Sequence, residues 1–124
     1  MPSTFYSVVV DAKDPRRLAE FWSAVLDFPI VFEDEEEGEF AIAKDKGTPP
    51  ALLFVRNDDA KQVKNRVHFD LNPTDQAAEV ERVLALGATR ADVGQTGEET
   101  WVVLADPEGN EFCILTARPQ HSTT

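Results

Sequence analysis

The chain lacks the features of several large protein classes. It has a single cysteine, Cys113, so no disulfide can form within it and nothing in its cysteine content requires an oxidising compartment. No apolar run approaches the roughly 18 residues that cross a bilayer, and the N-terminal residues lack the basic segment and apolar core of an export signal. We therefore expect a cytoplasmic protein with no membrane partner.

Basic residues are also scarce. The 12 Lys and Arg stand against 23 Asp and Glu, which gives a formal net charge of −11. Because clustered positive charge is what attracts a protein to nucleic-acid phosphates and anionic lipids, this balance argues against both as partners. The sequence also lacks a glycine-rich phosphate loop, a nucleophile elbow and a pair of cysteines at metal-ligand spacing.

What the chain does have is enough apolar material for one folding unit. It is 124 residues long and 42% hydrophobic, which is typical of a single domain with its own core. We expect that domain to cover residues 1–118. The polar tail over residues 119–124 is expected to fray.

The same order of predicted strands and helices occurs in both halves of the sequence. In the first half, a strand over residues 6–11 precedes Asp14 and Pro15, which are typical of a helix start, and an amphipathic helix runs to about residue 26. Three strands are predicted after that helix, over residues 30–32, 40–43 and 51–55.

The second half repeats this pattern. A strand over residues 67–71 precedes a helix that begins after Asp75 and ends at Gly87. Three more strands are predicted over residues 89–93, 101–104 and 111–115. The sequence therefore predicts an α+β fold of two βαβββ modules, about residues 5–56 and 66–117. We expect them to pair into an open, curved mixed-sheet barrel with the helices outside.

Four short motifs in this order match a known family. They are Asp14-Pro15 with Phe21-Trp22, Val67-His68-Phe69-Asp70-Leu71, Leu86-Gly87-Ala88, and Asp106-Pro107-Glu108-Gly109-Asn110-Glu111-Phe112. The sequence thus resembles, over residues 6–115, the glyoxalase/bleomycin-resistance/extradiol dioxygenase (vicinal oxygen chelate) superfamily, and above all its small glyoxalase-like proteins. The superfamily contains lyases, dioxygenases, epimerases, thiol transferases and metal-free drug-binding proteins, so fold alone leaves the chemistry open. The resemblance also implies a homodimer, because members often complete their clefts by pairing.

The metal ligands that the resemblance implies are mostly missing. Members with metal chemistry hold a divalent ion through a His or similar group on the first and fifth strands and a Glu on the last strand. The matching positions here are Ser7, His68 and Cys113. One imidazole does not make a site, so we expect neither a metal nor another cofactor. The alternative is a zinc site of His68, Cys113 and Glu111.

Strand alternation predicts the residues that face the cleft. His68 and Asp70 share one face of their strand, and an Asp so close to a His can orient its ring or raise its pKa, as a general base requires. The other interpretation of this Asp is that it satisfies loop amides. In the last strands, counting back across the turn places Trp101 on the helix side and Val102 opposite Cys113. The predicted ligand-binding residues are Ser7, Val9, Asp11, His68, Asp70, Val102, Glu111 and Cys113.

Two classes of function follow from these residues. The first is a cleft that binds a small, partly apolar organic molecule without metal, for sequestration or sensing, as the bleomycin-resistance branch implies. The alternative is a lyase- or dioxygenase-type enzyme. It would be metal-dependent through His68, Cys113 and Glu111, or metal-free with His68 and Asp70 as the catalytic acid and base. The residues leave open whether the protein is an enzyme.

Overall fold

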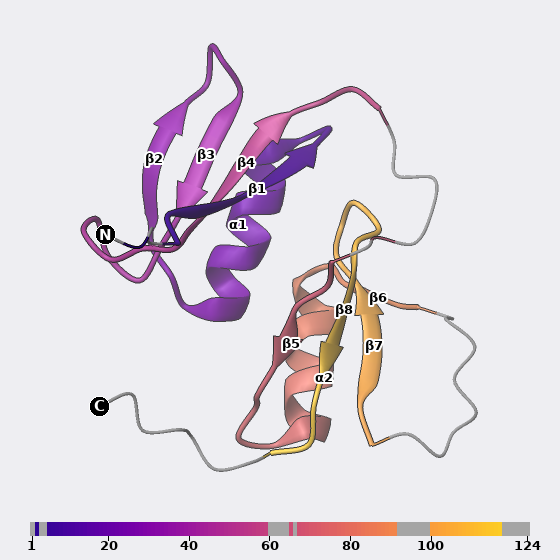
Figure 1. Ribbon diagram of the computed structural model, residues 1–124. Coiled ribbons are helices and arrows are strands. Elements are labelled where there is room, and N and C mark those ends of the chain that lie inside the picture. The colour runs from indigo at the N-terminus through magenta and orange to yellow at the C-terminus, as the bar shows by residue number, and fades with distance from the viewer. Residues whose placement is uncertain (1, 3–4, 60–64, 66, 92–99, 118–124) are drawn as a thin grey trace. The chain divides into compact units, whose positions relative to one another are not determined.

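Two units make up the chain in the computed structural model, Met1–Lys61 and Gln62–Thr124. The structure describes residues 2, 5–59, 65, 67–91 and 100–117. Within those residues, each unit has one helix and one four-stranded mixed sheet (Figure 1). The predicted α+β fold of two βαβββ modules is therefore confirmed. The single domain predicted over residues 1–118 stays a prediction, and the tail over residues 119–124 lies outside the described residues.

The first unit follows the predicted order of elements. Its elements are β1 (Ser7–Ala12), α1 (Pro15–Leu26), β2 (Ile30–Asp34), β3 (Glu39–Ile42) and β4 (Ala51–Arg56). The sheet order is β1-β4-β3-β2, in which β1 runs parallel to β4 and the other pairs are antiparallel. The helix begins where it was predicted to begin, because the Asp14 carboxylate accepts the backbone N–H of Arg17 at 3.2 Å.

The core of the first unit lies between α1 and one face of its sheet. The helix buries Leu18, Phe21 and Trp22, and the two aromatic rings meet edge to face with 5.2 Å between their centroids. From the sheet, Phe40 and Phe54 lie directly opposite each other on β3 and β4, and both are buried. The aromatic residues of the helix therefore belong to the core of this unit.

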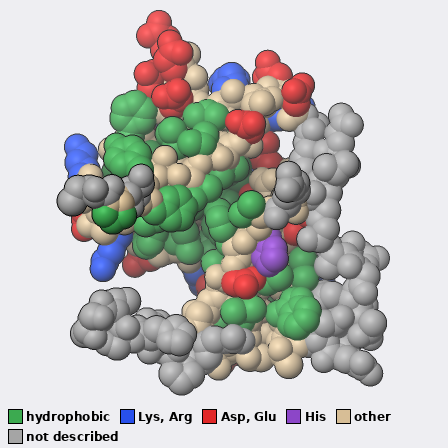
Figure 2. Space-filling view, viewed as in Figure 1, with side chains coloured by type: hydrophobic (Ala, Val, Ile, Leu, Met, Phe, Trp, Pro, Cys, Tyr) green, Lys and Arg blue, Asp and Glu red, His purple; other side chains and the backbone are tan. Residues whose placement is uncertain are grey.

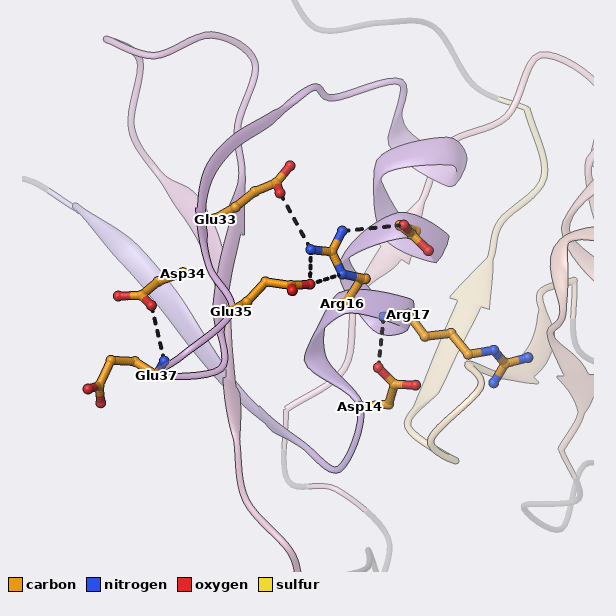
Figure 3. Close-up of polar contacts among 8 residues, drawn as sticks. Asp14, Arg16, Arg17, Glu33, Asp34, Glu35 and Glu37 are labelled. Atoms are coloured by element: carbon orange, nitrogen blue, oxygen red, sulfur yellow. Dashed lines mark hydrogen bonds and ion pairs between the residues drawn. The ribbon is translucent and has the colours of Figure 1, made fainter.

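An ionic cluster around Arg16 connects α1 to an acidic segment, residues 33–37, which begins at the end of β2. The guanidinium of Arg16 hydrogen-bonds to Glu35 and lies 3.6 Å from Glu33 and 4.0 Å from Glu20 (Figure 3). It also stacks over the ring of Phe40, 4.8 Å from the ring centroid. The hydrogen bond to Glu35 raises the pKa of Arg16. This part of the acidic segment thus has a structural role in holding the helix.

The second unit repeats the topology of the first. Its elements are β5 (Asp70–Leu71), α2 (Gln76–Leu86), β6 (Thr89–Arg90), β7 (Val102–Ala105) and β8 (Glu111–Ile114), in the sheet order β5-β8-β7-β6. Asp75 caps the helix start and Gly87 its end, as predicted. β5 is shorter than predicted, and residues 92–93 of the sixth predicted strand lie outside the described residues. Neither helix in the described part of the chain is long and apolar enough to cross a membrane.

The turn between β7 and β8 sets the register of the site. Asp106 is only 3% exposed, and its carboxylate accepts the backbone N–H groups of Glu108 and Asn110 at 2.9 and 3.0 Å. Gly109 has a φ of 90°, a conformation that glycine adopts without strain. Asn110 therefore belongs to this turn, which covers residues 106–110 between the end of β7 and the start of β8.

Candidate functional site

A pocket of about 280 Å³ lies on the sheet of the second unit. It is lined by His68, Asp70, Trp101, Val103, Glu111, Cys113 and Leu115. Four of these residues, His68, Asp70, Glu111 and Cys113, are among the residues that the sequence predicted to bind a ligand. The pocket therefore brings together side chains from β5, β7 and β8 and from the residues that flank these strands.

Strand pairing explains how these side chains meet. Asp70 on β5 is the direct partner of Cys113 on β8, and Cys113 is in turn the partner of Val103 on β7. Glu111 and Cys113 are alternate residues of β8 and so share one face. His68 precedes β5, and its contact of 3.2 Å with Asp70 places it on the same side. The predicted alternation of the fifth strand thus placed His68 and Asp70 correctly on one face.

The polar end of the pocket contains three side chains that could each ligate a metal ion, those of His68, Asp70 and Cys113. Nε2 of His68 lies 3.2 Å from Oδ1 of Asp70, and these side chains are 43% and 53% exposed. One ligand atom from each of His68, Asp70 and Cys113 lies within 4.8 Å of the other two. In Figure 2 the histidine lies at the surface beside acidic and hydrophobic side chains. The predicted acid–base pair is therefore in contact, with the thiol of the last strand nearby.

Glu111 is held away from these donors by Asn65. Oε1 of Glu111 accepts the backbone N–H of Asn65 at 3.2 Å, and Oδ1 of Asn65 accepts the backbone N–H of Glu111 at 3.0 Å. In the described part of the chain, the carboxylate that lies close to both His68 and Cys113 is that of Asp70. The sequence-based alternative of a zinc site had named Glu111 in its place.

The register that the sequence predicted for the last two strands was wrong, and the difference changes the apolar end of the pocket. The ladder pairs Val102 with Ile114 and Val103 with Cys113, one residue away from the prediction that placed Val102 opposite Cys113. Trp101 and Val103 line the pocket as a result, and Trp101 is 42% exposed. The signal that could have corrected the count is Asn110, whose backbone and side chain both hydrogen-bond to Asp106.

Three of the predicted ligand-binding residues belong to the first unit. Ser7, Val9 and Asp11 alternate along β1; Val9 is 56% exposed and Asp11 accepts a hydrogen bond from the side chain of Asn57 at 3.3 Å. Their role in ligand binding stays a prediction. β4, which is paired with β1, carries no His, Cys, Asp or Glu. β4 therefore offers no metal-ligating side chain beside Ser7, whose partner across the pair is Ala51.

Comparisons with known proteins agree with this fold. A family model described as a glyoxalase-like domain matches residues 7–115. The chain is similar to a glyoxalase/bleomycin resistance protein/dioxygenase family enzyme from Burkholderia phytofirmans PsJN, with a TM-score of 0.64 and 19% identity over 90% of this chain and 97% of that one. No curated protein matches the chain.

Two further solved structures share this fold. A trypanothione-dependent glyoxalase I from Leishmania major has a TM-score of 0.63 and 12% identity, over 93% of this chain and 87% of that one. A bleomycin resistance determinant encoded on the transposon Tn5 has a TM-score of 0.58 and 16% identity, over 94% of this chain and 100% of that one. At these identities the similarity shows the fold, and the chemistry has to be argued from the pocket.

Proposed function

The chain belongs to the family of glyoxalase-like domains, and we propose that it binds a small, partly apolar organic molecule in the pocket of its second unit, for sequestration or sensing. The observation that carries this proposal is the composition of that pocket. One cavity joins the exposed ring of Trp101 to the polar pair His68 and Asp70. Mostly apolar pockets with a few polar groups that fix orientation are typical of small-molecule sites.

The apolar end supplies the driving force for binding. Trp101, Val103 and Leu115 present hydrophobic surface to the pocket. Covering that surface with an apolar ligand removes it from water, at about 25 cal/mol for each Å² buried. A planar or aliphatic group of the ligand is therefore expected to lie against the Trp101 ring.

The polar end selects the charge of the ligand. Asp70 and Glu111 are both carboxylates, and the whole chain carries a formal net charge of −11. A cationic amine or a neutral hydrogen-bond donor complements this end, whereas an anionic group is repelled by it. The volume of about 280 Å³ lies near the lower limit of ordinary ligand pockets and favours a compact molecule.

A thermal-shift screen with compact aromatic amines and matched carboxylic acids tests this proposal. We expect amines to raise the melting temperature of the wild-type protein and acids to leave it unchanged, because binding to the native state stabilises it by mass action. The Trp101→Ala variant should lose the shift. Phe32→Ala is the matched control, since Phe32 is 48% exposed in the first unit and does not line the pocket. A shift that persists in Trp101→Ala would contradict binding in this pocket.

Metal-free acid–base catalysis is the second candidate function. The contact of 3.2 Å between His68 and Asp70 favours it, because a carboxylate at hydrogen-bond distance can orient an imidazole for proton transfer. Once a ligand is known, turnover is measured directly. Asp70→Asn should lower kcat by about 10²–10⁴-fold if the pair is catalytic. Binding with no turnover would leave the protein as a binding module.

Two properties come from the family and from the composition. We propose a homodimer, since family members often complete their clefts by pairing, and a cytoplasmic location, since the single cysteine requires no oxidising compartment. Sedimentation velocity measures the first and cell fractionation the second. A monomer at all concentrations would contradict the proposed dimer, and recovery in an exported fraction the proposed location.

A further inference from the structure

We infer that His68, Asp70 and Cys113 together bind one divalent transition-metal ion of the zinc class at the polar end of the pocket. One ligand atom from each of these residues lies within 4.8 Å of the other two. All three residues belong to the second unit, so the ligand set is complete without Ser7 or β4. It uses Asp70, which occupies no ligand position in the set that the family implies.

The distances are close to what a tetrahedral site needs. Bonds of about 2.0–2.3 Å to nitrogen, oxygen and sulfur place neighbouring donors roughly 3.3–3.8 Å apart. Closing from 4.8 Å therefore takes about 1 Å, which side-chain rotation can supply because His68 and Asp70 are 43% and 53% exposed. The contact between Nε2 of His68 and Oδ1 of Asp70 means that both side chains already point to the same place.

The strands hold the third ligand in a defined position. The backbone of Cys113 pairs with β5 on one side and β7 on the other, and its N–H donates to the carbonyl of Phe69 at 2.9 Å. Asp70 is its direct partner across the parallel pair. A ligand pair on adjacent paired strands is preorganised, so less entropy is lost when a metal binds.

The donor set determines the class of metal. An imidazole nitrogen, a thiolate sulfur and a carboxylate oxygen suit Zn²⁺ and its substitute Co²⁺, whereas Mg²⁺ and Ca²⁺ prefer oxygen ligands alone. The thiolate and the carboxylate together neutralise the charge of a divalent ion. Three protein ligands leave a fourth position open towards the pocket, as in zinc sites that bind an exchangeable group.

Glu111 provides a matched control. It lines the same pocket and stands two residues before Cys113, but its carboxylate accepts the N–H of Asn65. Replacing Glu111 by Gln removes a nearby negative charge without removing a ligand of the inferred site. The comparison of Asp70→Asn with Glu111→Gln therefore separates coordination from a general electrostatic effect.

The experiment is a Co²⁺ titration of the untagged full chain under reducing conditions, followed by absorbance. We expect one equivalent of Co²⁺ to bind with a thiolate-to-cobalt charge-transfer band, and Zn²⁺ to displace it. Cys113→Ser should lose the band, His68→Ala should lose stoichiometric binding, and Asp70→Asn should weaken binding by at least tenfold. Glu111→Gln and His121→Ala should keep both band and stoichiometry; the second variant removes the other histidine of the chain.

Other outcomes would overturn the inference. These are the absence of a charge-transfer band in the wild-type protein, a band that survives His68→Ala, or equal weakening in Asp70→Asn and Glu111→Gln. Circular dichroism checks that each variant is folded. The Asp70→Asn substitution is nearly isosteric, so this variant still tests the inferred site if His68→Ala or Cys113→Ser fails to fold.

Metal binding goes beyond the proposed binding of an organic molecule and is measured without one. If Co²⁺ fails to bind while amines still shift the melting temperature through Trp101, the metal site is wrong and the proposed function stands. If Co²⁺ binds as described and no organic molecule shifts the melting temperature, the proposed function is wrong and the metal site stands.

Discussion

Asp70 and Cys113 lie directly opposite each other on the adjacent parallel strands β5 and β8. This pairing places a carboxylate and a thiol side by side on one face of the second sheet. His68, two residues before Asp70, contacts it at 3.2 Å, and Val103 on β7 is the partner of Cys113 on its other side. The polar and apolar ends of the pocket therefore result from one register across three strands.

Gly38 is predicted to be intolerant of a side chain. It has a φ of 71°, and a Cβ added there would lie 2.9 Å from Cβ of Arg56. Gly38→Ala should lower the free energy of unfolding by about 1–2 kcal/mol from the left-handed backbone alone. Urea denaturation measures this change. Gly47→Ala is the control, because the nearest atom to its added Cβ is 3.9 Å away, and it should change the stability little. Equal effects of the two variants would contradict this explanation.

The buried carboxylate of Asp106 is predicted to stabilise the turn between β7 and β8. Asp106→Ala removes the acceptor for the backbone N–H groups of Glu108 and Asn110, at a cost of roughly 2–3 kcal/mol in the free energy of unfolding. Thermal and urea unfolding measure this cost. Asp75→Ala, which removes a helix N-cap, is the comparison and should cost about 1 kcal/mol. An Asp106 variant as stable as the wild type would refute the role of this carboxylate.

The pair of Glu79 and Arg82 is predicted to give a small, pH-dependent stabilisation. Hydrogen bonds of 2.8 Å from Arg82 lower the pKa of Glu79. A carboxyl group whose pKa is lower in the folded state contributes stability above its unfolded pKa, and that contribution is lost as the pH falls through the folded value. Glu79→Gln should therefore cost about 0.5 kcal/mol or less near pH 7 and nothing in strong acid.

Urea unfolding of the wild type and of Glu79→Gln across the acidic pH range measures the difference in their free energies of unfolding. Glu81→Gln on the same helix is the control, because Glu81 is exposed. A difference between wild type and Glu79→Gln that stays constant down to strong acid would show that the carboxylate charge is not its cause.

The two tryptophans are predicted to differ in their effect on stability. Trp22 is 2% exposed and packs edge to face against Phe21, so Trp22→Ala should cost about 3–5 kcal/mol. Trp101 is 42% exposed in the pocket, and Trp101→Ala should cost about 1 kcal/mol or less. Denaturant unfolding followed by circular dichroism compares them. A similar loss for both would mean that Trp101 belongs to the core.

Local sequence signals predicted much of the fold. Asp14 with Pro15, and Asp75 with Gly87, marked three helix boundaries within a residue of their observed places. These boundaries depend on a few neighbouring residues, because a cap satisfies backbone groups of its own first or last turn. The repeat of strand, helix and three strands was visible for the same reason.

The register of the last two strands was not visible in this way. Whether Asn110 belongs to the turn or to the strand depends on its hydrogen bonds to Asp106, and one residue of difference moves every side chain to the other face. That single step exchanged Val102 for Val103 in the pocket and moved Trp101 from the predicted core side to the pocket wall.

Sequence alone therefore determined the two βαβββ modules, the helix ends and the common face of His68 and Asp70, because capping and alternation act between residues that are near in the chain. Only the tertiary structure decided that Asp70 stands beside Cys113, that Glu111 turns to Asn65 and that Trp101 lines the pocket. These relationships depend on pairing between strands that are far apart in the chain. Several registers of such strands are acceptable locally, but only one fits the whole sheet.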